Sequence, residues 1–334
     1  MPLKHEVTAS CITLYDRAGS VLRVAMVIGD FPGHRVLAWL LVVAAVPVGV
    51  HAQQLEPRFY TNAPVGFSSL LTGYAYTEGN LSFDPSVPVE NADLRTNSAV
   101  MVLARTLDVR GRSAKLDVVL PYTWLSGTAL VDGEPRRREV SGFADARLRY
   151  SVNFSGAPAL SLREFQAYRQ NLIVGGSLQL TVPVGQYDDD KAVNIGTNRW
   201  ALKPELGMSK AWGPWSLDVA VAATLFTDNR DFLGDGTVAQ DPLYSLQSHI
   251  VYDFPSRAWI ALDGTWYYGG RTTVNDLRQD TLKNDTRLGL TLVQPLTRHF
   301  VFRIYASTGI SARTGDENDE IGIAGQYLWW PGGT

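Results

Sequence analysis

The sequence predicts an all-β protein, namely a transmembrane, antiparallel, up-and-down β-barrel of about 12 strands and of outer-membrane type. Three observations support this. Apolar and polar residues alternate in separate short segments, the connections between these segments are short and long in turn, and an apolar run typical of an export signal precedes them all.

Composition narrows the function classes. The chain has 334 residues, of which 45% are hydrophobic and 19% charged, a composition typical of globular or membrane proteins rather than of disordered ones. The formal net charge is -3 and no basic patch occurs, so the electrostatic footprint of a nucleic-acid-binding protein is missing. The single cysteine, Cys11, precedes the export signal, so we expect a mature chain without disulfides or thiolate chemistry.

The export signal is the run VLAWLLVVAAVPVGV, residues 36–50. His34 and Arg35 precede this run of 15 apolar residues, and Val50-His51-Ala52 follows it as a cleavage site of the small-x-small type. A spanning helix needs about 20 residues, so the run is too short to be one.

We therefore expect residues 1–52 to be an N-terminal extension with a cleavable signal peptide, and residues 53–334 to form the barrel. Translation from Met26 would give a leader of ordinary length, with residues 1–25 as an upstream extension. The localisation that follows is the outer membrane of a Gram-negative bacterium, reached by export.

The alternation is clearest in DARLRYSVNF, residues 145–154, where charged residues stand one by one between apolar residues. Successive side chains of a strand point to opposite faces, so one face is charged and the other apolar. In a soluble sheet the apolar face would be the core, whereas in an outer-membrane barrel it would meet lipid. The predicted strands are 65–77, 96–107, 114–124, 145–154, 171–184, 199–209, 215–226, 243–254, 258–268, 286–296, 299–310 and 320–330.

The connections favour the membrane barrel. DVRGRS, AWGP, PSR and LTRH are short, and the connections between them are long and polar, as expected for periplasmic turns and outer loops. Residues 155–170 are the exception, because this periplasmic turn is long, and we expect a short helix there. No stretch of 18 apolar residues follows residue 55, so no transmembrane helix is expected in the mature chain.

Aromatic residues are expected to form two belts, one at each membrane interface. The outer belt would contain Tyr122, Trp124, Trp200, Trp266 and Tyr268. The inner belt would contain Tyr150, Phe154, Trp212, Trp215, Tyr252, Phe254, Trp259, Phe300, Tyr327, Trp329 and Trp330. A soluble core would instead spread its aromatic residues through the strand centres.

Several stretches also carry a family resemblance. LEPRFYTNAPVG, GRSAKLDVVLPYTW, GFADARLRYSVNFSGAPAL and VPVGQYDDDKAVNIGTNRWALKPELGMSKAWG resemble the outer-membrane transporter family named for the meta-pathway of phenol degradation. The resemblance covers roughly residues 55–330. It implies a barrel associated with uptake of aromatic or other apolar compounds, and it brings no catalytic or binding residues with it.

Charged residues on the predicted inward faces are the candidate lumen-lining set. Both signs are present, so most of these residues could pair across strands and stiffen a filled barrel, while a subset lines a path. Twelve strands at ~4.8 Å spacing and ~40° tilt give a backbone diameter of roughly 24 Å. The set is Lys115, Asp117, Asp145, Arg147, Arg149, Arg199, Lys203, Glu205, Asp218, Asp263, Arg287 and Arg303.

Catalytic, cofactor and metal sites are not predicted. His249 and His299 are the histidines of the expected mature chain, and Ser248 falls on the face opposite His249, so no serine–histidine pair is expected. Two acidic sets lie in predicted outer loops, but their spacing does not match an EF-hand, and we interpret them as solvated or bridged by divalent cations. These sets are Asp188, Asp189 and Asp190, and Asp228, Asp231 and Asp235.

The predicted function is passive or facilitated uptake of a small, hydrophobic or aromatic compound across the outer membrane, without enzymatic activity. A non-selective small pore and a structural or adhesive barrel with functional surface loops are the alternatives. The expected partners are outer-membrane lipid, a small-molecule solute and, during biogenesis, the barrel-assembly machinery, with no nucleic acid.

The signal-peptide interpretation makes a direct prediction. Cleavage after Ala52 gives a mature chain that begins at Gln53. N-terminal sequencing of the membrane-inserted protein is expected to start there. A membrane fraction whose chains still carry residues 36–50 would overturn the interpretation.

Overall fold

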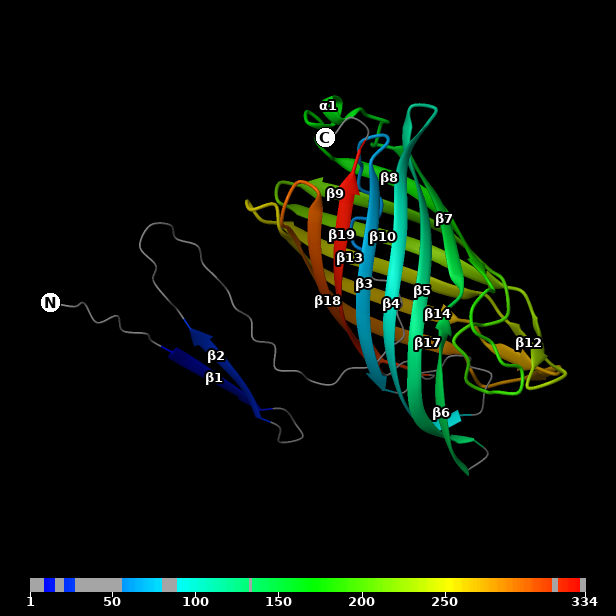
Figure 1. The fold of residues 1–334 in the computed structure, drawn as a ribbon. Coiled ribbons are helices and arrows are strands. Elements are labelled where there is room, and N and C mark those ends of the chain that lie inside the picture. The colour runs from blue at the N-terminus through cyan, green and yellow to red at the C-terminus, as the bar shows by residue number, and fades with distance from the viewer. Residues whose placement is uncertain are drawn as a thin grey trace. The chain divides into compact units, whose positions relative to one another are not determined.

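The computed structural model describes residues 9–15, 21–27, 56–79, 89–131, 134–313 and 318–330 (Figure 1). The chain divides into two units, residues 1–46 and 47–334. In the first unit β1 (Ala9–Tyr15) and β2 (Val21–Val27) pair as an antiparallel hairpin. The predicted signal run at 36–50 and its cleavage site lie outside the described residues. Within the described residues, no helix is both long and apolar enough to cross a membrane.

The second unit is a closed antiparallel barrel. β3 and β19 pair, and the β4–β5 pairing completes the circle. The two short strands β6 and β7 both pair with β5, one after the other, and so supply one barrel strand between them. The members are β3 (Ser68–Gly79), β4 (Val89–Val109), β5 (Arg112–Val131), β6 (Glu134–Phe143), β7 (Ala146–Ser155), β8 (Leu172–Val182), β9 (Ala201–Trp212), β10 (Trp215–Phe226), β13 (Leu243–Asp253), β14 (Trp259–Gly269), β17 (Lys283–Pro295), β18 (Phe300–Ser311) and β19 (Asn318–Trp329). The barrel therefore has 12 strands, and every predicted segment is one of them.

Parts of the predicted outer loops are more regular than their composition indicates. β4, β5 and β6 continue the sheet well past the predicted strand ends, as Figure 1 shows for the long β5–β6 ribbon. Two further loops form a separate four-stranded sheet from β11 (Asn229–Phe232), β12 (Gly236–Gln240), β15 (Thr272–Val274) and β16 (Leu277–Arg278). β12 pairs with β15 across more than 30 residues of sequence, and local composition carries no signal for such a pairing.

The long periplasmic turn at 155–170 contains α1 (Leu162–Phe165), as expected. A capping box explains why the helix begins there. Ser161 accepts a hydrogen bond from the backbone N–H of Glu164, and the Glu164 carboxylate accepts from the backbone N–H of Ser161. These hydrogen bonds hold the pKa of the exposed Glu164 carboxyl below its usual range.

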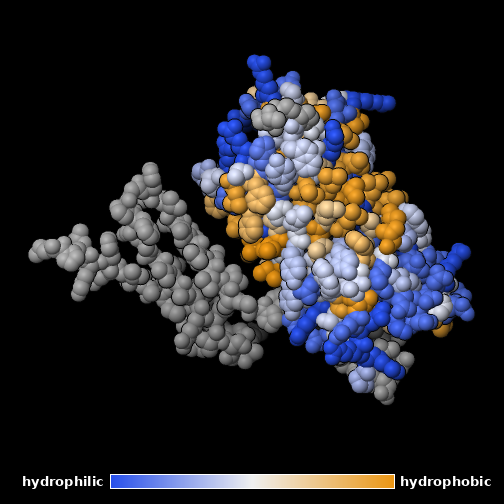
Figure 2. All heavy atoms as spheres, viewed as in Figure 1, coloured by the Kyte–Doolittle hydropathy of each residue, from blue (hydrophilic) through white to orange (hydrophobic). Residues whose placement is uncertain are grey.

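The barrel is polar inside and apolar outside. Leu148 on the outer face of β7 is 41% exposed, whereas Asp263 and Arg287 on inner faces are almost fully buried. Figure 2 shows the consequence on one face of the molecule, where a hydrophobic band lies between hydrophilic ends. The apolar face of DARLRYSVNF is therefore a lipid face.

Exposed aromatic residues gather near the strand ends, as predicted. Trp215 and Tyr252 lie in contact, with ring centres 4.7 Å apart, and Trp266 stacks on Tyr268 at 5.8 Å. Two members of the predicted inner belt were wrong. Trp259 is 8% exposed and points into the barrel, and Tyr150 lies in the middle of β7 rather than near its end. The inward residues of β14 are the odd-numbered ones, so the phase set by Asp263 also turns Trp259 inward.

A charged substitution on the lipid face tests which residues of β7 point outward. Leu148→Arg is expected to destabilise the inserted barrel by about 2 to 4 kcal/mol, because a guanidinium would enter hydrocarbon, whereas Leu148→Met should be nearly neutral. Urea-induced unfolding in lipid vesicles measures the difference. Equal stability of the two variants would show that Leu148 does not face lipid.

The strand pattern alone predicts that arginine is tolerated at Ser151, on the inner face. The structure revises this expectation. Ser151 is only 5% exposed and lies between Lys115 and Ser177 in the register, on a side of the wall that is already filled. We now expect Ser151→Arg to disturb the packing of the lumen.

Candidate functional site

The chain segment that precedes the first barrel strand, residues 56–67, contacts the inner face of the wall. Arg149 of β7 carries the most concentrated set of these contacts. Its guanidinium pairs with Glu56, lies 3.2 Å from Asp117 of β5, and stands 3.7 Å from the centre of the Phe59 ring. One buried cation thus joins the segment to two strands through a carboxylate and an aromatic ring.

Two further side chains of the wall hold the backbone of the segment. The Lys115 ammonium donates to the carbonyl oxygens of Phe59 at 2.6 Å and Thr61 at 2.9 Å. The Asn153 amide donates to the carbonyl of Tyr60 at 3.2 Å. The segment pairs with no strand here. These side-chain donors therefore satisfy carbonyl groups that a neighbouring strand would satisfy in a sheet.

Arg58 links the segment to the opposite part of the wall. Its backbone N–H donates to Asp218 of β10 at 2.7 Å, and its guanidinium pairs with Asp253 of β13. The same guanidinium lies 5.1 Å from the centre of the Trp259 ring. The segment therefore spans the lumen from β5 and β7 to β10, β13 and β14.

Tyr60 fits a recess made by two glycines. Gly175 of β8 and Gly207 of β9 face each other in the register, and a Cβ on Gly207 would come within 2.1 Å of the Tyr60 ring. The ring can lie against the wall only because no side chain projects at these two positions. The Tyr60 hydroxyl donates to Glu205 at 2.9 Å, which fixes the ring in the recess.

At the rim that carries α1, the segment turns into β3. Asn62 donates to the carbonyl of Pro158 at 3.1 Å, and the backbone N–H of Val65 donates to the carbonyl of Leu160 at 2.8 Å. The long periplasmic turn at 155–170 therefore anchors the end of the segment that leads into β3.

Two predicted lumen residues hold an outer loop instead. Asp145 accepts from the backbone N–H of Gly185 at 3.0 Å and from the N–H and hydroxyl of Thr197 at 2.9 and 2.7 Å. Arg199 donates to Gln240 at 2.6 Å. Residues 183–199 are thereby tied to the wall and to the loop that contains β12.

A buried polar chain lies on the inner face of β13, β14 and β17. Nδ1 of His249 and Oδ1 of Asp263 are 2.6 Å apart, and the Thr291 hydroxyl donates to the other carboxylate oxygen at 2.7 Å. His249 is 3% exposed, and Ser248 points to the other face, as the alternation requires. The sequence reasoning did not include His249 among the lumen residues, although its phase with Asp253 was a usable signal.

The rest of the predicted set is also on the inner faces. Lys203 pairs with Glu205 at 3.1 Å, and the guanidinium of Arg303 lies 6.0 Å from the centre of the Trp259 ring. Arg287 donates to Asn318 at 2.7 Å and to Ser307 at 3.0 Å, and Arg147 is half-buried beside the Arg149 cluster on β7. The structure thus gathers Lys115, Asp117, Arg149, Glu205 and Asp218 around the N-terminal segment, and it places Asp263, Arg287 and Arg303 elsewhere on the inner wall.

Glu56, Arg58 and Tyr60 are the site residues that sequence reasoning missed. They stand before the first strand, where no alternation marks them, and their partners are far away in the sequence. Arg58 and Asp253 are separated by 195 positions. The only local signal was the run of charged and aromatic residues in LEPRFYTNAPVG.

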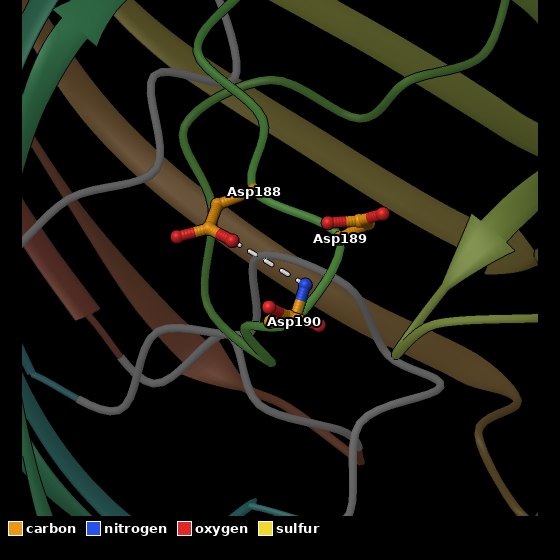
Figure 3. Close-up of side chains that lie close together, drawn as sticks. All are labelled: Asp188, Asp189 and Asp190. Atoms are coloured by element: carbon orange, nitrogen blue, oxygen red, sulfur yellow. Dashed lines mark hydrogen bonds between the residues drawn. The ribbon is translucent and has the colours of Figure 1, made fainter.

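The acidic cluster at 188–190 lies in an outer loop (Figure 3). Its three carboxylates offer oxygen atoms within 4.8 Å of one another. Asp188 accepts from the backbone N–H of Asp190 at 3.3 Å and has Arg138 at 3.8 Å, so part of its charge is already compensated. Asp189 and Asp190 are exposed, which fits the interpretation of a solvated loop.

Comparison with known protein families shows to which family the chain belongs. The family described as "Putative MetA-pathway of phenol degradation" matches residues 70–322. The chain belongs to this family. The matched region begins after the N-terminal segment, so the lumen-filling residues 56–67 lie outside it.

One of the similar solved structures supports the fold. The COG4313 outer membrane channel from Pseudomonas putida F1 is 20% identical, with a TM-score of 0.69, over 83% of this chain and 100% of that chain. The β-domain of the Bordetella autotransporter BrkA is 10% identical, with a TM-score of 0.47, over 78% of this chain and 99% of that chain. No curated protein matches the chain. The fold is that of an outer-membrane barrel, as the sequence predicted.

The contacts of Arg149 predict how the segment can be released. In Arg149→Gln, Glu56 and Asp117 would face each other without the cation, so the segment is expected to leave the wall. Limited trypsin digestion is then expected to cut after Arg58 and give a chain that begins at Phe59. Arg112→Gln, which changes an arginine that donates to the Phe154 carbonyl at the rim, is the matched control and should stay uncut. A variant Arg149→Gln as resistant as the control would contradict the role of Arg149.

Proposed function

We propose that the protein is an outer-membrane channel for small hydrophobic or aromatic compounds, and that its N-terminal segment must move before a path opens. The observation that carries the proposal is the way in which the lumen is filled. Residues 56–62 contact the wall through ion pairs, hydrogen bonds and ring contacts, but they form no sheet ladder with it. Such a segment can detach while all 12 strands remain paired.

The relatives support a channel. The family is described by a pathway of phenol degradation, and the similar structure from Pseudomonas putida F1 is described as an outer membrane channel. Compounds of that pathway are small and aromatic. Cations and rings meet where the segment contacts the wall, at Arg149 of the wall with Phe59 of the segment and at Arg58 of the segment with Trp259 of the wall. Arg149 could make the same kind of contact with a solute that carries an aromatic ring.

The proposal includes no catalytic step. Asp263 could orient His249 as a base, since the two side chains form a pair. The other oxygen of the Asp263 carboxylate, however, accepts from Thr291, and Ser248 points to the opposite face. Because Ser248 lies on the opposite face, the pair has no neighbouring serine on its own strand to activate. The interpretation of this pair is structural.

A surface-binding role is the second candidate, and one observation favours it. Two outer loops form their own four-stranded sheet, β11-β12-β15-β16, and Arg199 ties it to the barrel through Gln240. Ordered loops lose less entropy on binding a partner than coils do. In this role the lumen would stay closed.

Conductance separates the two candidates. In planar bilayers, the wild-type protein is expected to show small or rare openings, and the double variant Arg58→Gln with Arg149→Gln is expected to show larger and more frequent ones. Swelling of liposomes in aromatic acids and in aliphatic acids of equal size tests preference, which we expect to fall when Arg147 is changed to glutamine. Ion conductance without any solute preference would favour a non-selective pore. A correctly folded double variant that conducts no more than the wild type would contradict the channel.

A further inference from the structure

An open cavity of about 610 Å³ lies in the lipid-facing side of the wall, across β7, β8, β9, β10 and β13. Short side chains make its floor, namely Gly176, Pro204 and Ala223, and larger ones such as Tyr150 and Tyr244 stand around it. Gly176 lies in the middle of β8, whereas Pro204 is near the start of β9 and Ala223 near the end of β10, so the floor extends from the middle of the wall towards its outer end.

The sheet ladder is incomplete at this floor. β9 and β10 pair as far as Glu205 opposite Ala222 and again from Leu202 opposite Leu225, and the positions between them, which include Pro204, are not paired. Proline has no backbone N–H, so it cannot donate to the strand beside it. A carbonyl of β10 is therefore left without its ladder donor.

The rim also carries polar groups without partners. Tyr150 and Tyr244 are 40% and 52% exposed on the lipid side, and within the described part of the chain neither hydroxyl makes a hydrogen bond. Tyr150 lies in the middle of β7, where an unpaired hydroxyl in hydrocarbon is costly. Tyr244 lies near the outer end of β13, opposite Tyr268 of the outer aromatic belt. The cavity thus combines aromatic faces with free donors and a free acceptor, a combination that a plain acyl chain does not use.

The wall is thin at this place. Gly175 and Gly176 are consecutive, and the Tyr60 ring lies against the first on the inside while the Phe154 ring lies against the second on the outside. Glu205 lines the outer cavity and also a small inner cavity beside Tyr60 and His249. The outer cavity and the lumen segment are therefore separated by one layer of backbone.

We propose that this cavity is a binding site for a small, flat, hydroxylated aromatic molecule on the membrane side of the wall. The inference rests on the proposed function and deepens it, since it names the chemical class of the solute and the place where that solute meets the barrel from the lipid. The ring lies on the short floor between Tyr150 and Tyr244. The hydroxyl donates to the β10 carbonyl that Pro204 leaves unpaired and accepts from a tyrosine.

Binding of 2-naphthol to the full protein in phosphatidylcholine nanodiscs tests the site, with naphthalene as the probe that lacks the hydroxyl and empty nanodiscs as background. Ala223→Phe fills the floor and is expected to weaken 2-naphthol binding by about tenfold or more, a loss of the kind seen when an apolar pocket is blocked. Leu217→Phe, on the same face of β10 but outside the cavity, is the matched control and should bind normally.

Pro204→Ala examines the hydrogen bond separately. Alanine restores the N–H that closes the ladder, so 2-naphthol should bind about threefold or more weakly, while naphthalene binding should not change. A heat-modifiable gel shift shows that each variant is folded.

Saturable wild-type binding that Ala223→Phe removes and Leu217→Phe preserves would support the site. Absence of saturable binding would mean that lipid chains fill the cavity, and equal binding by the two phenylalanine variants would place the site elsewhere. Either result overturns the inference. Neither depends on bilayer conductance, which tests the opening of the lumen, so a failure of this inference and a failure of the channel can be told apart.

Discussion

The ion pairs that Arg149 makes inside a closed barrel are the interaction on which the filled lumen depends. A guanidinium removed from water is costly unless carboxylates compensate it, and here one of its carboxylates, Asp117, comes from the wall while the other, Glu56, comes from the N-terminal segment. Without the segment the wall would keep an excess cation, and without the cation the segment would bring a carboxylate towards Asp117. Each part makes the other stable.

The same constraint explains the distribution of side chains in the whole barrel. Lipid surrounds the outside, so the charged side chains of the strands point inward, and charges that are buried together have to be paired. A wall of 12 strands encloses more space than wall side chains fill by themselves. The N-terminal segment supplies the missing volume and the missing partners, including the Tyr60 ring in the recess at Gly175 and Gly207. Because it does so without joining a ladder, it is the part that can move with the smallest loss of structure.

The strands were predictable, and the contents of the barrel were not. Alternation is a local property, so DARLRYSVNF was enough to assign the inner face to Arg147 and Arg149 and the outer face to Leu148. The partner of Arg149 was expected to be another strand, and one of its partners is indeed Asp117, but the other lies 93 positions earlier in a segment without periodicity. Asp145 shows the same limit, because its backbone donors belong to a loop whose course no pattern predicts. Trp259 was predictable, since the phase of its own strand already turned it inward.

The position of the N-terminal segment is the central claim, and a pair of cysteines tests it most directly. Since Cys11 is expected to be removed with the leader, a variant with Tyr60→Cys and Gly207→Cys would carry two thiols and no others. Because the Tyr60 ring lies against Gly207, these thiols should form a disulfide upon mild oxidation in intact outer membranes and then fail to react with maleimide. Each single variant should stay reactive after denaturation. Two thiols that remain free in the folded, oxidised double variant would show that the segment does not lie against β9, and the account of a filled lumen would be wrong.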